Sequence, residues 1–411
     1  MQITFVSNFI NHHQIPFCDA MYAIDDSFRF IATEEMSDER KQMGWSSDTA
    51  CPYVVYAYEN PTKAQELIDN CDVLIVGWIR DESIVRSRLR SGKPAIRISE
   101  RIYREGQWRF VSPKGLIAKY KSHTSLRKLP VYLLCNGAYV ASDYLLIGAY
   151  KNKMYKFGYF PATRRYENVA GLWEKKEKLN QVEIYASEEL PIEPPTLTDK
   201  DIQIVWAGRF IPLKHPEYMV RLAADMCYLG YRFHIHMIGG GQMEEELKQS
   251  AEYEMIEDYI TFHGYASANE VRDIMEKCHI HIFTSNFLEG WGAVINEGMN
   301  AGLVPIANDE TGAAPFLIKD GENGLLYHKG EYDDMKAKVV TLFENPQLIE
   351  KYGRAAYDTI VTNWNAEIAA HRVMDMCNQI TNGHICPPSE GPLSVAELIK
   401  PDFWASGRLG E

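Results

Sequence analysis

The sequence has no apolar run of about 18 residues, the length that a transmembrane helix needs, although 46% of its 411 residues are hydrophobic. Its first residues, Met1–Val6, lack the basic start and the long apolar core of a signal peptide, so they predict a buried strand. Eight cysteines are scattered without paired spacing. They argue against a disulfide framework and predict reduced thiols in a cytoplasmic protein.

Motifs for metals and dinucleotides are also missing. The run Gly239-Gly240-Gly241 lacks the last glycine of Gly-x-Gly-x-x-Gly and follows a later strand of its domain, which argues against a dinucleotide loop. Asp199-Lys200-Asp201 has the spacing of a metal-binding Asp-x-Asp, but it lies before a strand and beside a proline-rich stretch, so we expect it to be solvated. Cys377, His384 and Cys386 lack a fourth ligand and a common spacing. We expect no metal and no cofactor.

The net charge of −13 conceals one basic region. Residues 80–128 contain fourteen Lys or Arg and four Asp or Glu, a local balance of +10, so the rest of the chain carries −23. Two interpretations stay open: contact with an anionic membrane surface, as a cytoplasmic protein peripheral to the inner face, or a solvated face that offsets the acidic remainder. The region has few aromatic residues and no recognition motif, so nucleic acid is not an expected partner.

Short apolar runs alternate with helix-like polar segments in both halves of the chain, the pattern of a parallel sheet with helices on both faces. The expected strands of the first half are Gln2–Ser7, Phe28–Thr33, Val54–Ala57, Val73–Gly77, Ala95–Ser99, Val131–Leu134 and Met154–Phe157. Those of the second half are Ile202–Ala207, Phe233–Ile238, Ile260–His263, His279–Phe283, Val304–Ala307 and Gly324–Tyr327.

A chain of 411 residues is too long for one hydrophobic core, so we expect two domains. The first is 1–195 and ends in a linker marked by Pro191, Pro194 and Pro195, which cannot continue a helix or a central strand. The second is 196–384. For 385–411, rich in Pro and Gly, two alternatives stay open: a return to the first domain or a disordered tail.

Two carboxylates and two cations lie in or just beyond loops that follow strands of the second domain. Glu289 lies in the loop after a strand, before a Gly-Trp-Gly turn, and Glu297 lies in the first turns of the next helix. Turn glycines let the backbone approach a ligand, and a helix start directs N–H groups at an anion. Arg209 and Lys214 lie five residues apart in the turn after the first strand of this domain, where a forked contact and a point charge suit phosphates.

This part of the sequence resembles the donor site of retaining glycosyltransferases of glycosyltransferase family 4, also called glycosyl transferases group 1. The resemblance rests on the Glu289-x7-Glu297 spacing after a serine-bearing strand end, and on the runs Ala301–Ile306 and Asp320–Tyr327. It is specific from Ile202 to Trp364 and loose before that. It implies the GT-B fold, in which two Rossmann-like, doubly wound α/β domains face each other across a cleft.

The resemblance also implies a function. A hexosyltransferase-like enzyme would move a sugar from a nucleotide-sugar donor to a glycan or lipid-linked acceptor, in cell-surface polysaccharide or glycoconjugate synthesis. Arg209 and Lys214 would contact the donor phosphates, and Glu289 would position the transferred sugar as a further catalytic residue. Same-face attack is the preferred mechanism of related enzymes, and a covalent intermediate stays open.

The remaining donor contacts follow from the same resemblance. Glu297 would bind the ribose hydroxyls, because a carboxylate accepts from two adjacent groups. For Gly240 an alternative stays open, a close-packed turn that lines the cleft without touching phosphate. The other expected donor-binding residues are Gly208, Gly292, Ala293 and Val294.

The resemblance implies that the acceptor binds the first domain and the donor binds the second. Between Met1 and Gly44 the chain has no glycine, so we do not expect a backbone phosphate cradle after the first strand. His12 and His13 are polar groups there that could contact the acceptor or the diphosphate, and a structural hydrogen-bonding role is the alternative. Glu100 and Arg101 follow another strand and are the second candidates. The pattern identifies no catalytic base. Two alternatives stay open for the whole chain: a catalytically silent sugar-nucleotide-binding partner of a transferase, or a sugar-nucleotide epimerase of the same fold.

Overall fold

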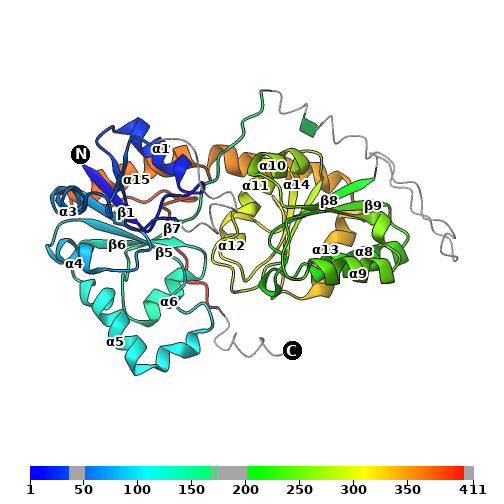
Figure 1. The fold of residues 1–411 in the computed structure, drawn as a ribbon, viewed down its shortest axis with the longest axis horizontal. Coiled ribbons are helices and arrows are strands. Elements are labelled where there is room, and N and C mark those ends of the chain that lie inside the picture. The colour runs from blue at the N-terminus through cyan, green and yellow to red at the C-terminus, as the bar shows by residue number, and fades with distance from the viewer. Residues whose placement is uncertain (37–50, 168–171, 174–200, 402–411) are drawn as a thin grey trace. The chain divides into compact units, whose positions relative to one another are not determined.

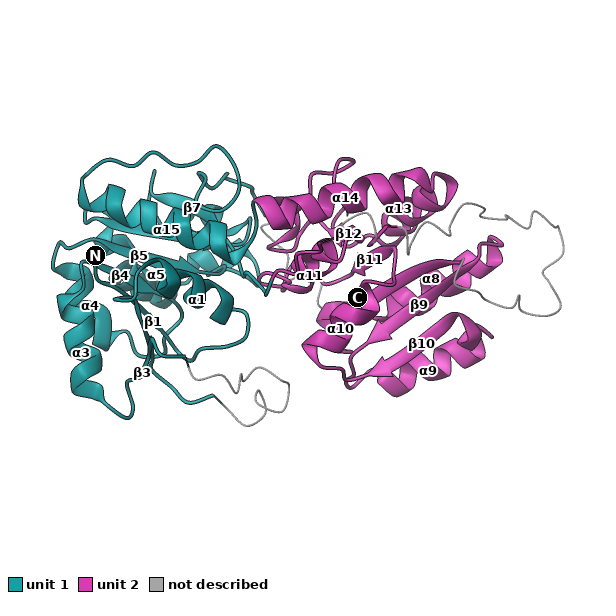
Figure 2. Cartoon of the chain, turned by 90° about the horizontal axis from the view of Figure 1, so that it is seen from above, with its two compact units in different colours: residues 1–162, 363–411 teal, residues 163–362 magenta. Residues whose placement is uncertain are grey.

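The computed structural model describes residues 1–36, 51–167, 172–173 and 201–401. The chain forms two compact units (Figure 2): unit 1 comprises residues 1–162 and 363–411, and unit 2 comprises residues 163–362. The chain thus leaves unit 1 after Ala162 and returns to it at Asn363, whereas the sequence-based division has its limits at residues 195 and 384. The reason lies in the last long helix, which packs on the first helix of unit 1.

Unit 1 contains a seven-stranded sheet of order β3-β2-β1-β4-β5-β6-β7, in which all neighbours are parallel. Buried strands such as the Val-Leu-Ile-Val run of β4 have apolar residues on both faces, as expected for a sheet covered on both sides. The strands are β1 (Ile3–Ser7), β2 (Arg29–Ala32), β3 (Val54–Tyr56), β4 (Val73–Val76), β5 (Ala95–Ser99), β6 (Val131–Asn136) and β7 (Met154–Phe157).

Asparagine side chains cap the starts of two helices of unit 1. Asn60 accepts a hydrogen bond from the Lys63 N–H at 3.1 Å, and Asn365 accepts one from the Ile368 N–H at 3.0 Å. Helix α15 lies against α1 (Figure 1). The helices are α1 (Ile15–Ile24), α3 (Pro61–Asn70), α4 (Ser83–Arg90), η1 (Gln107–Val111), α5 (Pro113–Ser122), η2 (Thr124–Leu126), α6 (Val140–Leu146) and α15 (Ala366–Thr381).

The segment after α15 runs along the edge of the unit 1 sheet. Lys156 exchanges backbone hydrogen bonds of 2.8 Å with Leu393 and Ser394, and the Ala396 N–H donates to the Met154 carbonyl at 3.0 Å. These bonds form an antiparallel bridge beside β7. The described part of the expected tail therefore covers the β7 edge of unit 1.

Unit 2 contains a six-stranded parallel sheet of order β10-β9-β8-β11-β12-β13. Its strands are β8 (Ile202–Ala207), β9 (Phe233–Ile238), β10 (Ile260–Gly264), β11 (Ile280–Phe283), β12 (Val304–Asn308) and β13 (Leu325–Tyr327). Its helices are η4 (Pro212–Lys214), α8 (Glu217–Tyr228), α9 (Glu244–Tyr253), η5 (Glu257–Tyr259), α10 (Ala268–Met275), α11 (Val294–Asn300), α12 (Ala314–Leu317), α13 (Tyr332–Glu344) and α14 (Gln347–Thr362).

Both faces of the unit 2 sheet are covered. Alternate residues of β8 point to opposite sides: Ile204 joins a core with α8, α9 and α13, whereas Val205 joins a smaller core with α10 and the ends of α11. This is the doubly wound arrangement. The predicted fold class, two Rossmann-like α/β domains, is confirmed.

One expectation near the start of unit 2 is wrong. Asp201 is only 5% exposed, and its carboxylate lies 2.8 Å from Nε of Arg232. Because Arg232 precedes β9, the neighbour of β8, the ion pair ties the starts of two adjacent strands together. Asp201 is therefore not solvated, and the other two residues of Asp199-Lys200-Asp201 lie outside the described residues.

Candidate functional site

The order of strands in unit 2 selects one place for a ligand. Strands β8 and β11 are neighbours, but from β8 the chain continues to β9 on one side and from β11 to β12 on the other. At such a switch point the loops after the two strands diverge, and ligands of open α/β sheets bind outside the carboxyl ends of the strands there. The loop after β8 contains Arg209 and Lys214, and the loop after β11 contains Glu289.

Lys214 and Glu289 meet at this switch point. The Lys214 Nζ lies 2.5 Å from Oε2 of Glu289, and the two side chains are 15% and 17% exposed. The same ammonium lies 5.4 Å from the centre of the Phe283 ring, within the range of a cation–π contact. Residues 75 positions apart in the sequence are thus brought together.

A short turn holds Glu289 in place. Asn286 accepts hydrogen bonds through its side chain from the Leu288 N–H at 3.0 Å and through its carbonyl from the Glu289 N–H at 2.9 Å. The Asn286 N–H in turn donates to the Leu213 carbonyl at 2.9 Å. The loop that carries the carboxylate is therefore bonded to the loop that carries the lysine.

Gly292 allows α11 to start close to the sheet. Its φ of +98° is in the region that favours glycine, and a Cβ atom there would lie 2.6 Å from Cζ of Phe283. Ala293 and Val294 follow at the start of α11, where the first N–H groups have no partner within the helix. Further along, a Cβ on Gly298 would lie 2.5 Å from Nδ1 of the buried His281. Two glycines therefore press this helix against β11.

Glu297 lies in the first turn of α11 and is partly exposed. Burial of its carboxyl group raises the pKa to about 7 from the usual 4.5, and the charge of Arg272 acts in the opposite direction. Near neutral pH this carboxyl group can therefore both accept and donate hydrogen bonds. A pair of adjacent hydroxyl groups can use both roles.

The glycine run after β9 serves close packing. A Cβ on Gly239 would lie 2.0 Å from the Gly208 carbonyl oxygen, and one on Gly241 would lie 2.6 Å from that of Phe210. The Phe210 N–H donates to the Gly240 carbonyl at 2.8 Å. The run thus supports the loop after β8, where the Arg209 side chain is exposed.

In unit 1 three of the four acceptor-side candidates, His12, His13 and Glu100, gather around Tyr159, a residue that the sequence did not single out. The ring of His13 lies 5.8 Å from the Tyr159 ring, and the His12 ring lies 3.8 Å from that of His13. The Tyr159 hydroxyl donates to Oε1 of Glu100 at 3.1 Å. Burial and, to a smaller extent, His12 lower the pKa of His13 to about 3, so His13 is neutral. Arg104 also contacts Glu100.

Arg101 lies apart from this group. Its guanidinium is 3.3 Å from the carboxylate of Asp143, which is fully buried and also accepts from Gln107 at 2.9 Å. The side chain of Arg101 is 5% exposed. Its partner is thus a buried carboxylate of the same unit.

The sequence signal for Tyr159 is weak, because an aromatic residue after the last strand of a sheet is ordinarily part of the core.

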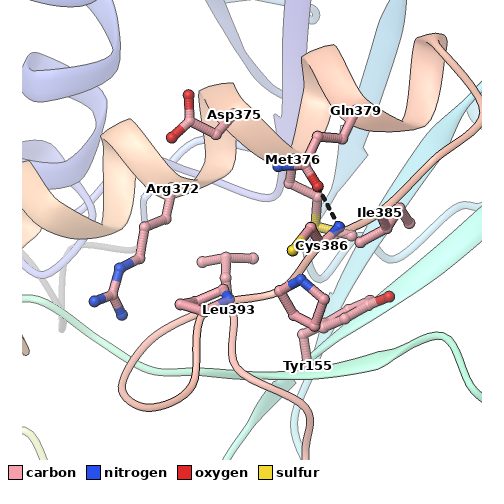
Figure 3. Close-up of a pocket in the computed structure, with 10 residues that line it drawn as sticks. Tyr155, Arg372, Asp375, Met376, Gln379, Ile385, Cys386 and Leu393 are labelled. Atoms are coloured by element: carbon pink, nitrogen blue, oxygen red, sulfur yellow. Dashed lines mark hydrogen bonds between the residues drawn. The ribbon is translucent and has the colours of Figure 1, made fainter.

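A pocket of about 260 Å³ lies elsewhere in unit 1, between α15, the returning segment and β7 (Figure 3). Its lining includes Tyr155, Arg372, Met376, Cys386 and Leu393, and none of the residues predicted for the donor or acceptor sites. Arg372 donates to the carbonyls of Glu390 and Pro392, both at 2.8 Å, so this wall anchors the returning segment.

No group of three or more His, Cys, Asp or Glu side chains among the described residues could hold a metal ion. Of the helices in the described ranges, none has the length and apolarity to cross a membrane.

Comparisons with known proteins show which families and structures this chain resembles. Residues 189–359 match the model of the family Glycosyl transferases group 1. An uncharacterized glycosyltransferase of Methanocaldococcus jannaschii is 28% identical over 149 residues, which are 36% of this chain and 40% of that protein. The poly(ribitol-phosphate) alpha-N-acetylglucosaminyltransferase of Staphylococcus aureus is 22% identical over 171 residues, 42% of this chain and 34% of that protein. The matches therefore span less than half the length of these relatives.

A solved structure extends the likeness to nearly the whole chain. HepE of Anabaena, in complex with UDP, superposes with a TM-score of 0.63 and 14% identity over 92% of this chain and 100% of that one. At this identity the likeness shows the fold alone. Residues 189–359 therefore match the glycosyl transferases group 1 family, glycosyltransferase family 4, and the fold of the chain is GT-B.

Proposed function

We propose that the protein is a retaining glycosyltransferase that moves a sugar from a nucleotide-sugar donor to a glycan or lipid-linked acceptor, in the synthesis of cell-surface polysaccharide or glycoconjugates. The observation that carries the proposal is the contact of Lys214 with Glu289 at the switch point of unit 2. It brings a cation for phosphate and a carboxylate for sugar hydroxyls to one place. The name of the staphylococcal relative and the UDP bound to HepE support this class of activity and donor.

In this proposal the donor diphosphate is held by fixed charges. Lys214, the exposed Arg209 and the N–H groups at the start of α11 would neutralise the phosphates as the bond to the sugar breaks. Because Lys214 contacts Glu289, a diphosphate that binds the lysine would displace this carboxylate toward the sugar. Glu297 would bind the ribose hydroxyls.

These charges are proposed to make the reaction independent of metal ions. We expect the rate of sugar transfer, measured with equimolar enzyme and donor, to be the same in EDTA and in Mg²⁺. A strict requirement for the metal would contradict this part of the proposal.

Retention of configuration requires attack on the face of the sugar that the nucleotide leaves, or two successive inversions. We favour same-face attack, in which the departing phosphate takes the acceptor proton. Proton NMR of the first product formed gives the anomeric configuration. An inverted product would refute the assignment as a retaining enzyme.

The acceptor is proposed to bind unit 1. His12, His13, Tyr159 and Glu100 gather at the carboxyl ends of β1, β5 and β7, where they offer both donors and acceptors for hydroxyl groups. Tyr159→Phe removes the hydroxyl that contacts Glu100 and should raise KM for the acceptor without changing KM for the donor. An acceptor KM equal to that of the wild type would contradict a role of Tyr159 in acceptor binding.

The basic region 80–128 is proposed to contact an anionic membrane surface, which would make the protein cytoplasmic and peripheral to the inner face. Helix α5 has no buried residue, and the exposed side chains Val111, Ile117 and Tyr120 are 70%, 59% and 55% accessible. The exposed Lys114 and Lys121 flank Ile117 and Tyr120 in the sequence. A basic and apolar surface of this kind suits anionic lipid, to which each basic residue contributes about 1 kcal/mol.

Co-sedimentation with vesicles tests this contact. The protein should bind vesicles that contain an anionic lipid and not neutral ones, and Lys114→Glu with Lys121→Glu should abolish binding. A matched control, Lys248→Glu with Lys351→Glu on unit 2, should leave it unchanged. Equal binding to neutral vesicles, or none to either, would reject the proposal.

The first test of the whole function is thermal unfolding with UDP, GDP, ADP, CMP and dTDP, each with EDTA and with Mg²⁺. A ligand of the native state raises the melting temperature by mass action. A shift with one diphosphate in EDTA identifies the nucleotide sugars to assay for transfer. Binding without transfer or hydrolysis would favour a silent sugar-nucleotide-binding partner, and interconversion of the donor sugar without an acceptor would favour an epimerase.

A further inference from the structure

The geometry points to Thr284 as a positioning residue for Lys214. It lies directly after β11, at the switch point, and its side chain is 1% exposed. The inference rests on the proposed function, because it concerns the cation proposed to bind the donor diphosphate. It adds a residue that contacts no substrate and acts through the backbone of the lysine.

Two hydrogen bonds give Thr284 this role. The indole Nε1–H of Trp206 donates to the Thr284 hydroxyl at 2.7 Å, and the hydroxyl donates to the Lys214 carbonyl at 2.5 Å. The direction of both bonds is fixed, since an indole N–H can only donate and a carbonyl can only accept. The threonine hydroxyl therefore has both of its roles assigned by its partners.

These two hydrogen bonds link three segments at the carboxyl ends of the unit 2 strands. Trp206 is on β8 and is 2% exposed, Thr284 follows β11, and Lys214 ends the η4 turn. Beside it, the Asn286 N–H holds the neighbouring carbonyl of Leu213 at 2.9 Å. The loop after β11 thus binds two successive carbonyls of the turn after β8.

The turn needs this support. His215, the residue after Lys214, has a φ of +48°, a conformation that is unfavourable for a residue with a side chain and persists where the surroundings impose it. A lysine side chain has about 2 kcal/mol of rotamer entropy. Fixing its backbone, with the Phe283 ring and Glu289 around the ammonium, confines the charge before any ligand arrives.

Thr284→Val tests the inference, since valine has nearly the same shape and no hydroxyl. Thr284→Ser keeps the hydroxyl and is the rescue variant. The matched control is Thr359→Val in α14, where the hydroxyl likewise accepts one bond, from Asn323 at 2.9 Å, and donates one, to the Ala355 carbonyl at 2.7 Å. Both valine variants lose the same number of hydrogen bonds, and only one affects Lys214.

Two measurements on the full chain follow. In hydrogen exchange by mass spectrometry, the peptide that contains residues 211–215 should exchange faster in Thr284→Val, and at the wild-type rate in Thr284→Ser and Thr359→Val. In calorimetry, the Kd for UDP should rise between about three- and tenfold in Thr284→Val, the effect of one neutral hydrogen bond. The Kd for uridine should not change, because only the diphosphate meets the lysine.

Each outcome of these measurements either supports or overturns the role of Thr284. Unchanged exchange at 211–215 in Thr284→Val overturns the positioning of the turn, whatever the ligand. Faster exchange with an unchanged Kd for UDP also overturns the inference, because the turn then moves without consequence for the phosphate. If the wild-type protein binds no UDP and exchange is faster in Thr284→Val, the positioning of the turn stands and the use of UDP in the proposed function fails.

Discussion

Replacement of Glu289 by glutamine tests its contact with Lys214 separately from its proposed contact with the transferred sugar. The carboxylate lies 2.5 Å from Lys214 Nζ, and less than a fifth of either side chain is exposed. Glutamine keeps the shape and one acceptor oxygen but removes the negative charge. The lysine then has no charge partner at this position, and a bound diphosphate no longer competes with a carboxylate for it.

The sizes of the effects follow from this geometry. Loss of a hydrogen bond between charged groups costs about 1.5–3 kcal/mol, and the retained amide oxygen should keep the loss of folding stability near the lower limit. Affinity for the nucleoside diphosphate should stay nearly intact or become slightly tighter. Turnover should fall by about 10²–10³, the usual cost of one group that stabilises the transition state.

The assay compares kcat and the Kd for the diphosphate in the two proteins, using the nucleotide sugar identified by thermal unfolding. Glu350→Gln is the control, because it removes an exposed i,i+4 ion pair with Arg354 in α14 and should change nothing measurable. Wild-type turnover in Glu289→Gln would remove Glu289 from the reacting sugar. A Kd raised more than about tenfold, or 1.4 kcal/mol, would instead mean that the carboxylate positions Lys214 for the diphosphate.

Three further predictions follow from the same site. Lys214→Ala should weaken binding of the diphosphate by about 1.5–3 kcal/mol, whereas Lys248→Ala, which breaks an exposed pair in α9, should not; equal affinities by calorimetry would reject the phosphate role. The raised pKa of Glu297 means that the folded protein holds this proton more tightly than the unfolded chain, so the carboxyl favours folding at low pH and this contribution is lost as pH rises from about 4.5 to 7. Glu297→Gln should therefore melt above the wild type at pH 8 with a difference that shrinks toward pH 4.5, and a difference independent of pH would contradict the shift. Gly292→Ala should destabilise unit 2 by more than Gly321→Ala, because both have positive φ but only the first Cβ would meet a ring, at 2.6 Å; equal melting temperatures would show that α11 can move away.

Much of the fold follows from the sequence because parallel strands buried on both faces leave strong apolar runs. The expected strand Val73–Gly77 is β4, and the expected strand Phe233–Ile238 is β9. The family pattern predicted the region of Lys214 and Glu289, since loops after strands gather at one sheet edge. It could not predict their contact, which depends on the order β8-β11.

Other parts of the site are not encoded in local patterns. Tyr159 and Glu100 lie 59 residues apart and meet only because β5 and β7 end at the same sheet edge. Thr284 is an ordinary strand-end residue until Trp206, 78 positions away, points at it. The burial of Asp201 depends in the same way on Arg232, on the neighbouring strand.

The course of the chain through unit 1 has a consequence for its synthesis. Strands β1 to β7 leave the ribosome first, but α15 and the residues that cover the β7 edge come after the whole of unit 2. Domains generally fold as units during translation, so unit 2 can finish while unit 1 still exposes the α1 surface and an unpaired strand edge. Such an edge can pair with another chain. The residues after position 362 therefore cover surfaces of unit 1 that are synthesised much earlier. Nascent chains stalled near residue 362 should depend most on chaperones.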